Sequence, residues 1–591
     1  MTTRTRHAFF QPRALAVAVA ATLGCVAQVE ALTFNVGELE GQFDSALSVG
    51  ASWSVRGADP DFVSTASGGK ASSRTSDDGR LNFKKGETFS KIFKGIHDLE
   101  LKYGDTGVFI RGKYWYDFET KDEHRLFYDI QDHNRKQAAQ SSGAEILDAF
   151  IYHNYTIGNL PGSVRVGKQV VSWGESTFIQ NSINSINPID AAAFRRPGAE
   201  IKEGLIPVNM LYLSQSLTDS VSMEAFYQLE WDQTVADNCG TFFSTADVIA
   251  DGCEDRLVVF GPDLPPGESN NSFAPGENVY IPRAGDRDAR DSGQYGVALR
   301  WFAEQLNDTE FGLYALNYHS RGPVFSTIRT TTPSPAFIPG APNARYFVEY
   351  PEDIRLYGLS FQTNVGGTAL SGEVSYRPNM PMQINSTDLS FAALGLPVSP
   401  VFTSGSAQNV SGGDIHGYER KPFTQAQITA LQFFDRVLGA SRLTVIGEVG
   451  YNHISGISDD VGELRFGRDP IFGAGEFSAP GVCAAFNSAN PDECQGDGFY
   501  TSNSWGYRLR ASADYSNVVA GINLTPSVSW SHDVDGYGPN FNEGSKAVSI
   551  GLSADYQNTY NASLSYTDFF GGEYNTVTDR DFVALSFGVN F

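Results

Sequence analysis

The sequence has few of the features that mark helical proteins. Beyond its first 31 residues it contains no stretch of roughly 18 or more apolar residues, which excludes helices that span a bilayer. Of 591 residues only 5 are methionine and 5 are cysteine, and long tracts of Ala, Glu, Lys and Leu are scarce. The chain instead has 60 glycines and 13% aromatic residues, a composition typical of many short strands.

Motifs of catalytic sites are also absent. The sequence has no Gly-x-Ser-x-Gly, no His-Glu-x-x-His, no phosphate-binding loop and no dinucleotide fingerprint. A hydrolase assembled from a Ser and a rim histidine is the alternative, but isolated histidines at an interface are more often polar rim residues. We therefore expect no enzyme, no cofactor and no metal. The histidines that fall near expected strand ends are His153, His319, His453 and His532.

Positive charge is scarce, since 43 Lys and Arg face 68 Asp and Glu, for a net charge of -25. Such a balance argues against nucleic acid as a partner. Acidic stretches such as residues 286–288 and 533–536 are expected in solvated loops, where they can collect divalent cations that bridge lipopolysaccharide. Outer-membrane lipid and lipopolysaccharide are thus the expected surroundings.

The N-terminus has the pattern of a secretory signal. Arg4, Arg6 and Arg13 precede an apolar run over residues 14–27 that is too short to span a bilayer. The small residue Ala31 predicts cleavage after it, so residues 1–31 are assigned as signal peptide and 32–591 as the mature domain. Export of this kind leads to the oxidising periplasm.

Strict alternation of apolar and polar residues dominates the C-terminal half. Apolar residues at 550, 552, 554 and 556 alternate with small or polar ones, and the pattern resumes at 560 after a turn at Gln557-Asn558. An equivalent hairpin is predicted one step earlier, with its turn at Ser516-Asn517. Alternation with Tyr and Trp at strand ends is typical of strands that face lipid on one side and an aqueous lumen on the other.

Connection lengths separate a barrel from a soluble sandwich. We identify about 18 strands between residues 43 and 591, and every second connection is short, as at Gly104-Asp105 and Val365-Gly366. The others are long, up to residues 233–292 and 455–502. Alternating turns and loops predict an all-β transmembrane antiparallel barrel, with both termini on the periplasmic side.

The last strand carries a further sign. Residues 583, 585, Phe587, 589 and the terminal Phe591 are apolar and share one face. A terminal Phe after such a pattern resembles the signal read by the outer-membrane barrel assembly machinery, which we expect as a partner. The predicted location is the outer membrane of a Gram-negative bacterium.

The four cysteines of the mature chain form two local pairs. Cys239 and Cys253 share one long connection, and Cys483 and Cys494 share another. Two disulfides are therefore predicted, since the oxidising periplasm favours them. A zinc site is not expected, because no Cys-x-x-Cys or clustered His accompanies these residues.

Several motifs in one order resemble a large proteobacterial outer-membrane family catalogued as a domain of unknown function (thirteen-oh-two), over essentially the whole mature chain. The resemblance implies passage of a lipidic or amphipathic solute, with a resistance-nodulation-division type inner-membrane transporter and a periplasmic carrier as partners. The matching stretches are residues 39–45, 50–53, 170–178, 187–190, 207–211 and 225–231.

The connection over residues 172–207 is unusually rich in Ile, Phe, Pro and Asn for an exposed loop. We expect it to fold into the lumen as a constriction, with Trp173 and Glu175 fixing its exit from the strand. Asn184, Asn187 and Asp190 are expected to bond its backbone; the alternative is a cap over the barrel mouth. Arg195 and Arg196 are predicted at the narrowest point, and the residues predicted to be buried include Phe178, Ile179, Ile183, Ile186, Ile189 and Phe194.

Lumen-facing charges on the strands are mixed in sign. They are expected to form solvated ladders that brace an aqueous interior, with a track that guides a solute as the alternative. The expected function is thus a channel; a general porin and a structural or adhesive barrel stay open as alternatives. The predicted inward charges are Arg111, Lys113, Arg165, Arg300, Arg442, Arg508 and Arg510 with Glu224, Glu230, Glu304, Glu373, Glu448 and Asp514.

Overall fold

The structure is a computed structural model. It describes residues 32–127, 129–253, 257–260, 279–331, 343–406, 411–458, 462–477, 479–486 and 489–591. The predicted signal peptide, residues 1–31, lies outside the described residues.

Antiparallel strands dominate the fold. Eighteen of them close into one barrel, and a short strand, β1, adds to its edge, as the sequence predicted. The members of this sheet are β1 (Leu32–Val36), β2 (Leu39–Ser54), β3 (Thr88–Tyr103), β4 (Thr106–Asp117), β5 (Ser142–Ile157), β6 (Leu160–Gln169), β7 (Val208–Ser216), β8 (Val221–Gln228), β11 (Tyr295–Ala303), β12 (Thr309–Tyr318), β15 (Ile354–Val365), β16 (Thr368–Gln383), β18 (Tyr418–Asp435), β19 (Arg442–Ile454), β20 (Asn503–Val519), β21 (Ile522–Asp535), β22 (Lys546–Tyr556), β23 (Tyr560–Phe570) and β24 (Phe582–Asn590).

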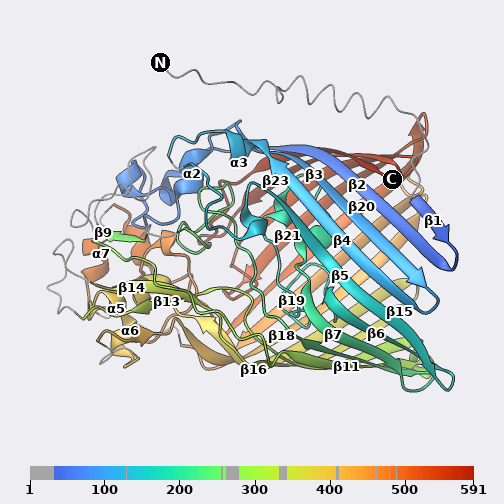
Figure 1. Cartoon of the computed structure of the whole chain (residues 1–591). Helices are drawn as coiled ribbons and strands as arrows, with labels where there is room; N and C mark the ends of the chain where they lie inside the picture. Colours follow the sequence, from blue (N-terminus) through green and yellow to red (C-terminus); the bar gives the residue numbers. More distant parts are fainter. Residues whose placement is uncertain are drawn as a thin grey trace, which may run out of the picture.

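Closure joins the two ends of the chain. β24 pairs antiparallel with β2 from Ala46↔Asn590 to Ser54↔Phe582, and the backbones of Ser45 and Phe591 exchange two further hydrogen bonds. Short turns gather at one end of the barrel, the turn end, and long connections at the other, the loop end (Figure 1). Strand β1 and the C-terminus both lie at the turn end.

The register confirms the predicted faces. Leu564 pairs with Leu552 on one side and Leu585 on the other, so the three leucines share one face. Leu552 is 43% exposed and Leu564 49% exposed, although both lie in the middle of the sheet. Apolar side chains therefore cover the outside of the barrel, and the small and polar residues between them face the lumen.

Turn chemistry explains one success and one error. Gln557 and Asn558 both take positive φ (57° and 56°) and form the predicted turn between β22 and β23. The turn predicted at Ser516-Asn517 is wrong, because β20 continues to Val519. Asn517 has a φ of 49°, and the register between β20 and β21 shifts beside it, so this residue forms a bulge instead of a turn.

The wall of the barrel is uneven in height. Strands β6, β7, β8, β11 and β12 have 10, 9, 8, 9 and 10 residues. Strands β2, β3, β16 and β18 have 16, 16, 16 and 18. The wall is thus lowest along the first group and higher on either side of it, and it is short again at β22, β23 and β24, which have 11, 11 and 9 residues.

The loop end holds two small sheets and most of the helices; η6 instead lies in the short turn after β11, and η4 and α4 lie in residues 172–207. An apolar core that includes Tyr346, Leu389 and Phe423 lies among its connections, beside a buried ion pair between Arg465 and Asp388 (2.6 Å). No described helix is long and apolar enough for a membrane span. The sheets are β9 (Val258–Phe260) with β10 (Val279–Tyr280) and β13 (Val324–Ile328) with β14 (Arg345–Glu349) and β17 (Asp414–Ile415); the helices are η1 (Pro60–Phe62), η2 (Thr65–Ser67), α2 (Asp78–Asn82), α3 (Phe118–Asp122), η3 (Gln137–Ala139), η4 (Ala193–Arg195), α4 (Ile201–Gly204), η6 (Glu304–Leu306), α5 (Ser386–Ala393), α6 (Pro400–Thr403), η7 (Pro470–Phe472), α7 (Val482–Phe486) and η8 (Pro491–Cys494).

Both predicted disulfides are present. Cys239 joins Cys253 with their Cα atoms 6.2 Å apart, and Cys483 joins Cys494 at 5.6 Å. Each bridge closes a segment within one connection, so each stiffens its own part of the loop end.

Two predicted lumen charges lie elsewhere. Glu230 follows the end of β8 and accepts a hydrogen bond from Asn209, on the exposed face. Glu304 begins the turn after β11 and is exposed. Both predictions are wrong because β8 ends before Glu230 and β11 ends before Glu304, so the alternation of inward and outward side chains does not extend to these residues.

The outward face can be tested by placing a charge on it. Leu564→Arg should lower the free energy of unfolding in a bilayer by about 2 to 4 kcal/mol, because a cation at mid-membrane lacks water. Folding into lipid vesicles, followed by the heat-dependent shift of the folded barrel on a denaturing gel, measures the effect. Ser565→Arg is the matched control: Ser565 is adjacent to the outward Leu564 on the same strand, so it faces the lumen and the variant should fold normally.

Candidate constriction site

The inward segment, residues 172–207, leaves the wall at the end of β6. Trp173 is 1% exposed and donates through Nε1 to Glu224 Oε2 on β8 at 2.6 Å. Its ring packs against Phe226 and Tyr314, whose centroids lie 5.1 and 6.0 Å away. The indole thus ties the start of the segment to strands β8 and β12.

Glu175 adds a second contact between the segment and the wall, because it belongs to a group of three carboxylates around Arg300. The guanidinium of Arg300, on β11, lies 3.3 Å from Glu224, 2.9 Å from Glu310 and 3.8 Å from Glu175. Burial raises the pKa of Glu175 to about 7, against the opposing attraction of Arg300. One cation therefore ties the segment to three strands of the wall.

The tip of the segment is held by a carboxylate on the far side. Glu448, on β19, accepts hydrogen bonds from the backbone N–H groups of Thr177, Phe178 and Ile179 at 3.0, 2.6 and 2.8 Å. Its carboxylate also accepts from the hydroxyl of Thr429 at 3.1 Å. Because Glu448 is 1% exposed, these bonds form away from bulk water, where bonds to a charged acceptor are strongest.

A second wall glutamate holds the segment on either side of that tip. Glu373, on β16, accepts from the backbone N–H of Glu175 and, at 3.3 Å, from that of Ile183. On the same strand, Arg377 donates to the carbonyl of Ser182 at 2.7 Å and to the hydroxyl of Ser185 at 2.9 Å. Lumen-facing side chains thus replace the strand partners that the segment lacks.

Asn187 closes the loop on itself. Its amide donates to the carbonyls of Gln169 and Ile206, at the two ends of the connection, and its oxygen accepts from the N–H of Val171. Asn184, expected to bond backbone groups, instead donates to the hydroxyl of Ser172 at 2.9 Å. One asparagine side chain thus helps to tie the two ends of the segment together, beside the backbone bond from Ile206 to Pro188.

The returning half crosses to the opposite wall. Lys113, on β4, pairs with the fully buried Asp190 at 3.2 Å, which in turn accepts from the N–H of Ala193. Lys94, on β3, pairs with Glu203 at 2.6 Å. Between these ties Pro197 lies so close to Gly50 of β2 that a Cβ at this glycine would stand 2.5 Å from the proline ring.

Arg195 and Arg196, predicted at the narrowest point, are both engaged. Arg195 pairs with Asp237 and lies over the ring of Phe243 at 4.9 Å. Arg196 donates to a loop carbonyl at 3.0 Å and lies over Trp115 at 4.9 Å. These partners belong to the loops after β8 and β4 and to the upper part of β4, so both cations serve to join the segment to the loop end.

The connection between β21 and β22 also folds inward, which the sequence analysis missed. Asn540 donates to Gln425 on β18 at 2.8 Å. Phe541 is 2% exposed, and it and Ile179 both lie beside Gly450 of β19. The only local signal was the short, Gly- and Asn-rich sequence of residues 536–544, which does not distinguish an inward from an outward turn.

One part of the wall remains uncovered. In the part of the chain that the structure describes, no residue of β20 to β23 has a hydrogen bond or ion pair to the inward segment. The lumen face of β20 to β23 consists mainly of small hydroxylated residues, with Arg508 and Arg510 on β20. The rows across this wall, read from the strand register, are Arg510–Ser529–Ser549–Thr567, Ser512–Ser527–Gly551–Ser565 and Thr525–Ser553–Ser563.

Other lumen charges form the expected ladders. Arg111 of β4 lies 2.7 Å from Asp98 and 3.3 Å from Asp148, on the strands either side. Arg508 pairs with Asp533 at 2.6 Å. Opposite charges on adjacent strands thus neutralise each other at these two places on the wall.

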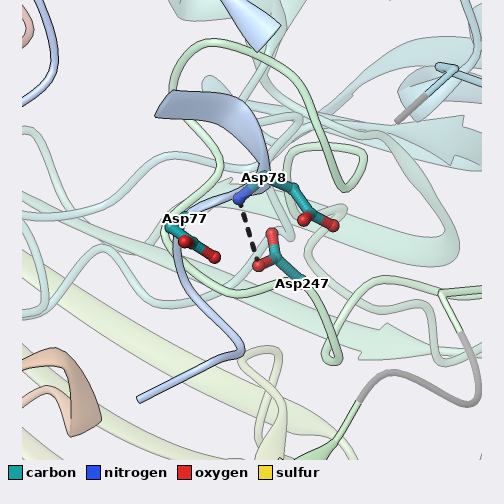
Figure 2. Close-up of side chains that lie close together, drawn as sticks. All are labelled: Asp77, Asp78 and Asp247. Carbon is teal, nitrogen blue, oxygen red and sulfur yellow. Dashed lines mark hydrogen bonds between the residues drawn. The ribbon is translucent and has the colours of Figure 1, made fainter. Parts of the chain in front are cut away.

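Three buried aspartates gather at the loop end. Asp77 and Asp78 lie where α2 begins, and Asp247 approaches them from another loop (Figure 2). The N–H of Asp78 donates to Asp247 at 3.4 Å, and Asp77 accepts from the N–H of Ser64 at 2.9 Å. The cluster therefore helps to join the loops that follow β2 and β8.

A closed antiparallel barrel of eighteen strands with a polar lumen and an apolar exterior defines the class of transmembrane β-barrels. The chain belongs to the family described as "Protein of unknown function (DUF1302)", whose model matches residues 13–591. Comparison with curated proteins finds no match.

Comparison with solved structures finds matches that cover most of the chain at low identity. They include OccAB1 of Acinetobacter baumannii (11% identity, 95% of this chain and 99% of that one, TM-score 0.39). The channel DcaP of the same organism matches with 11% identity, coverage of 94% and 99%, and a TM-score of 0.35. Pseudomonas aeruginosa OccD3 matches with 11% identity, coverage of 95% and 93%, and a TM-score of 0.36. Likeness at this level assigns no solute.

Removing the carboxylate of Glu448 should make residues 177–179 at the tip of the inward segment more mobile. In Glu448→Gln three N–H groups lose a charged acceptor, each bond being worth about 1.5 to 3 kcal/mol. Amides 177–179 should then exchange hydrogen at least about tenfold faster, measured by mass spectrometry of the protein in detergent micelles. Glu310→Gln, which touches Arg300 but no segment amide, should leave that exchange unchanged. Equal exchange in the wild type and Glu448→Gln would contradict the assigned role.

Proposed function

We propose that the protein is a passive channel of the Gram-negative outer membrane, in which the inward segment narrows the lumen. The observation that carries this is the asymmetric filling of the barrel. Side chains of β3, β4, β8, β16 and β19 fix the segment across the lumen, while the hydroxylated wall of β20 to β23 stays uncovered. A barrel whose only task was structural would have no need of one polar, uncovered wall.

The two faces of the barrel support a location in the outer membrane. The apolar exterior is suited to lipid, and short turns on one side with long loops on the other are the pattern of outer-membrane barrels. The turn end, with both β1 and the C-terminus, then faces the periplasm, and the loop end faces outward. Phe591 completes the edge of β24 against β2, which suits a role as the signal for the barrel assembly machinery.

An amphipathic solute is the cargo that the loop end favours. A cavity of about 1220 Å³ lies among the outer connections. Apolar side chains such as Val248, Phe325 and Phe391 line it together with hydroxyls such as Ser386 and Thr387. Such a mixed lining suits a molecule with one apolar and one polar part. Transfer onward by a periplasmic carrier and a resistance-nodulation-division type transporter fits that cargo.

A general porin is the second candidate. The hydroxylated wall favours it, because small hydroxyls bond water and many solutes without selecting one. Lipid bound to the purified barrel, identified by mass spectrometry in cells with and without the inner-membrane transporter, separates the two. Enrichment of one amphipathic species when the transporter is deleted favours specific transport, and no enrichment favours the porin.

Shortening the inward segment tests the constriction. Deletion of residues 183–193 should raise single-channel conductance in a planar bilayer, because the passage widens while the strands and Phe591 remain. Asn184→Ala is the control, since this exposed side chain bonds only Ser172 and its loss should leave conductance unchanged. Unchanged conductance in a folded deletion variant would mean that the segment does not limit passage, and no conductance in any variant would overturn the channel itself.

A further inference from the structure

Arg510 differs from the other lumen-facing arginines at the level of the segment. Arg300 and Arg508 lie within hydrogen-bonding distance of carboxylates at 2.9 and 2.6 Å, and Arg377 is bonded to Tyr318, Ser182 and Ser185. The side chain of Arg510 is exposed, and among the described residues no acceptor bonds it. Its guanidinium therefore faces the aqueous lumen with its donors available.

The position of Arg510 places it just beneath the tip of the inward segment. Glu448, which binds that tip, pairs in register with Arg508. Arg510 follows two residues further toward the turn end, a step of roughly 7 Å along a strand. A solute that passes the tip on the uncovered side must therefore pass this guanidinium.

Nearby carboxylates have other partners. Glu448 is surrounded by three N–H groups and the hydroxyl of Thr429. Asp533 pairs with Arg508 and accepts from the N–H of Asn542, and Asp514 accepts from the hydroxyl of Thr525. These contacts leave Arg510 as a cation that an incoming anion can neutralise.

Hydroxyl groups extend from this cation along the wall. Ser529, Ser549 and Thr567 continue its row on the next three strands, at steps of roughly 4.8 Å, and Ser512 and Ser527 lie in the next row. Thr567 donates to Ser549 at 3.0 Å, so neighbouring hydroxyls of the row are close enough to form hydrogen bonds with each other. Hydroxyls both donate and accept, and so can bond an oxyanion or the hydroxyls attached to it.

We propose that Arg510 and the serine row beside it form a binding subsite for an oxyanion, a carboxylate or phosphate, on a solute that carries hydroxyl groups. The inference rests on the proposed channel and names the chemistry of its cargo: the polar part of an amphipathic solute would be anionic. A guanidinium binds such a group through two parallel N–H donors, and the hydroxyls add donors at neighbouring positions. Because the wall is solvated, the subsite holds its ligand weakly enough to release it.

Block of ion current by a small probe tests the subsite. Single channels in potassium chloride are titrated with gluconate, which has one carboxylate and several hydroxyls, and with sorbitol, the uncharged polyol of the same chain length. Gluconate should interrupt the current of the wild type, and sorbitol should not. Arg510→Gln should raise the gluconate concentration for half block at least about tenfold, which corresponds to 1.4 kcal/mol.

Arg442→Gln is the matched control. Arg442 also faces the lumen on a neighbouring strand, but it lies near the turn end and beside Asp435 at 3.6 Å, so its loss should leave gluconate block unchanged. Equal block in the wild type and Arg510→Gln, or equal block by sorbitol and gluconate, would overturn the subsite while the channel stands. Absence of any conductance in the folded wild type would instead overturn the proposed channel.

Discussion

Every backbone N–H and C=O group at membrane depth needs a partner inside the protein, because lipid offers none. The pairing of β2 with β24 gives partners to the backbone groups of the last open edge. Closure is the only arrangement that leaves eighteen strands with an apolar face no unpaired edge in lipid. From closure follow the even strand number, the turns at one end and the loops at the other, and a lumen into which polar side chains must point.

The same need governs the inward segment, which meets it without strands. Carboxylates of Glu373 and Glu448 accept its N–H groups, and the side chains of Gln228 and Arg321 both donate to the carbonyl of Ile186, at 3.0 and 3.1 Å. Side chains of the wall thus act as the neighbours that a strand would have had. Such bonds hold a defined shape, yet they occupy only part of the lumen, and this leaves room for passage.

Much of the fold could be predicted from the sequence, because lipid imposes a period of two on every strand. The last hairpins show it best, since Leu552, Leu564 and Leu585 lie outward as expected. The inward fold of residues 172–207 was predictable from its apolar content. The residues that hold it were not: Glu448 is 269 positions from Ile179, and a contact over that distance leaves no local pattern. The turn at Ser516-Asn517 failed because turn-forming residues also form bulges.

The uneven height of the wall bears on how the protein sits in its membrane. A tilted strand of about 9 to 11 residues just crosses the hydrocarbon layer. Strands β6, β7, β8, β11 and β12, with their 8 to 10 residues, have none to spare, so they set the level at which the bilayer surfaces meet the barrel. Residues in excess of that on β16 and β18 must then rise above the lipid. The outer rim of the barrel is therefore not level: it is low along β6, β7, β8, β11 and β12 and rises along β16 and β18 close beside them, so a neighbouring molecule in the membrane meets less protein above the lipid along the first group than along the second.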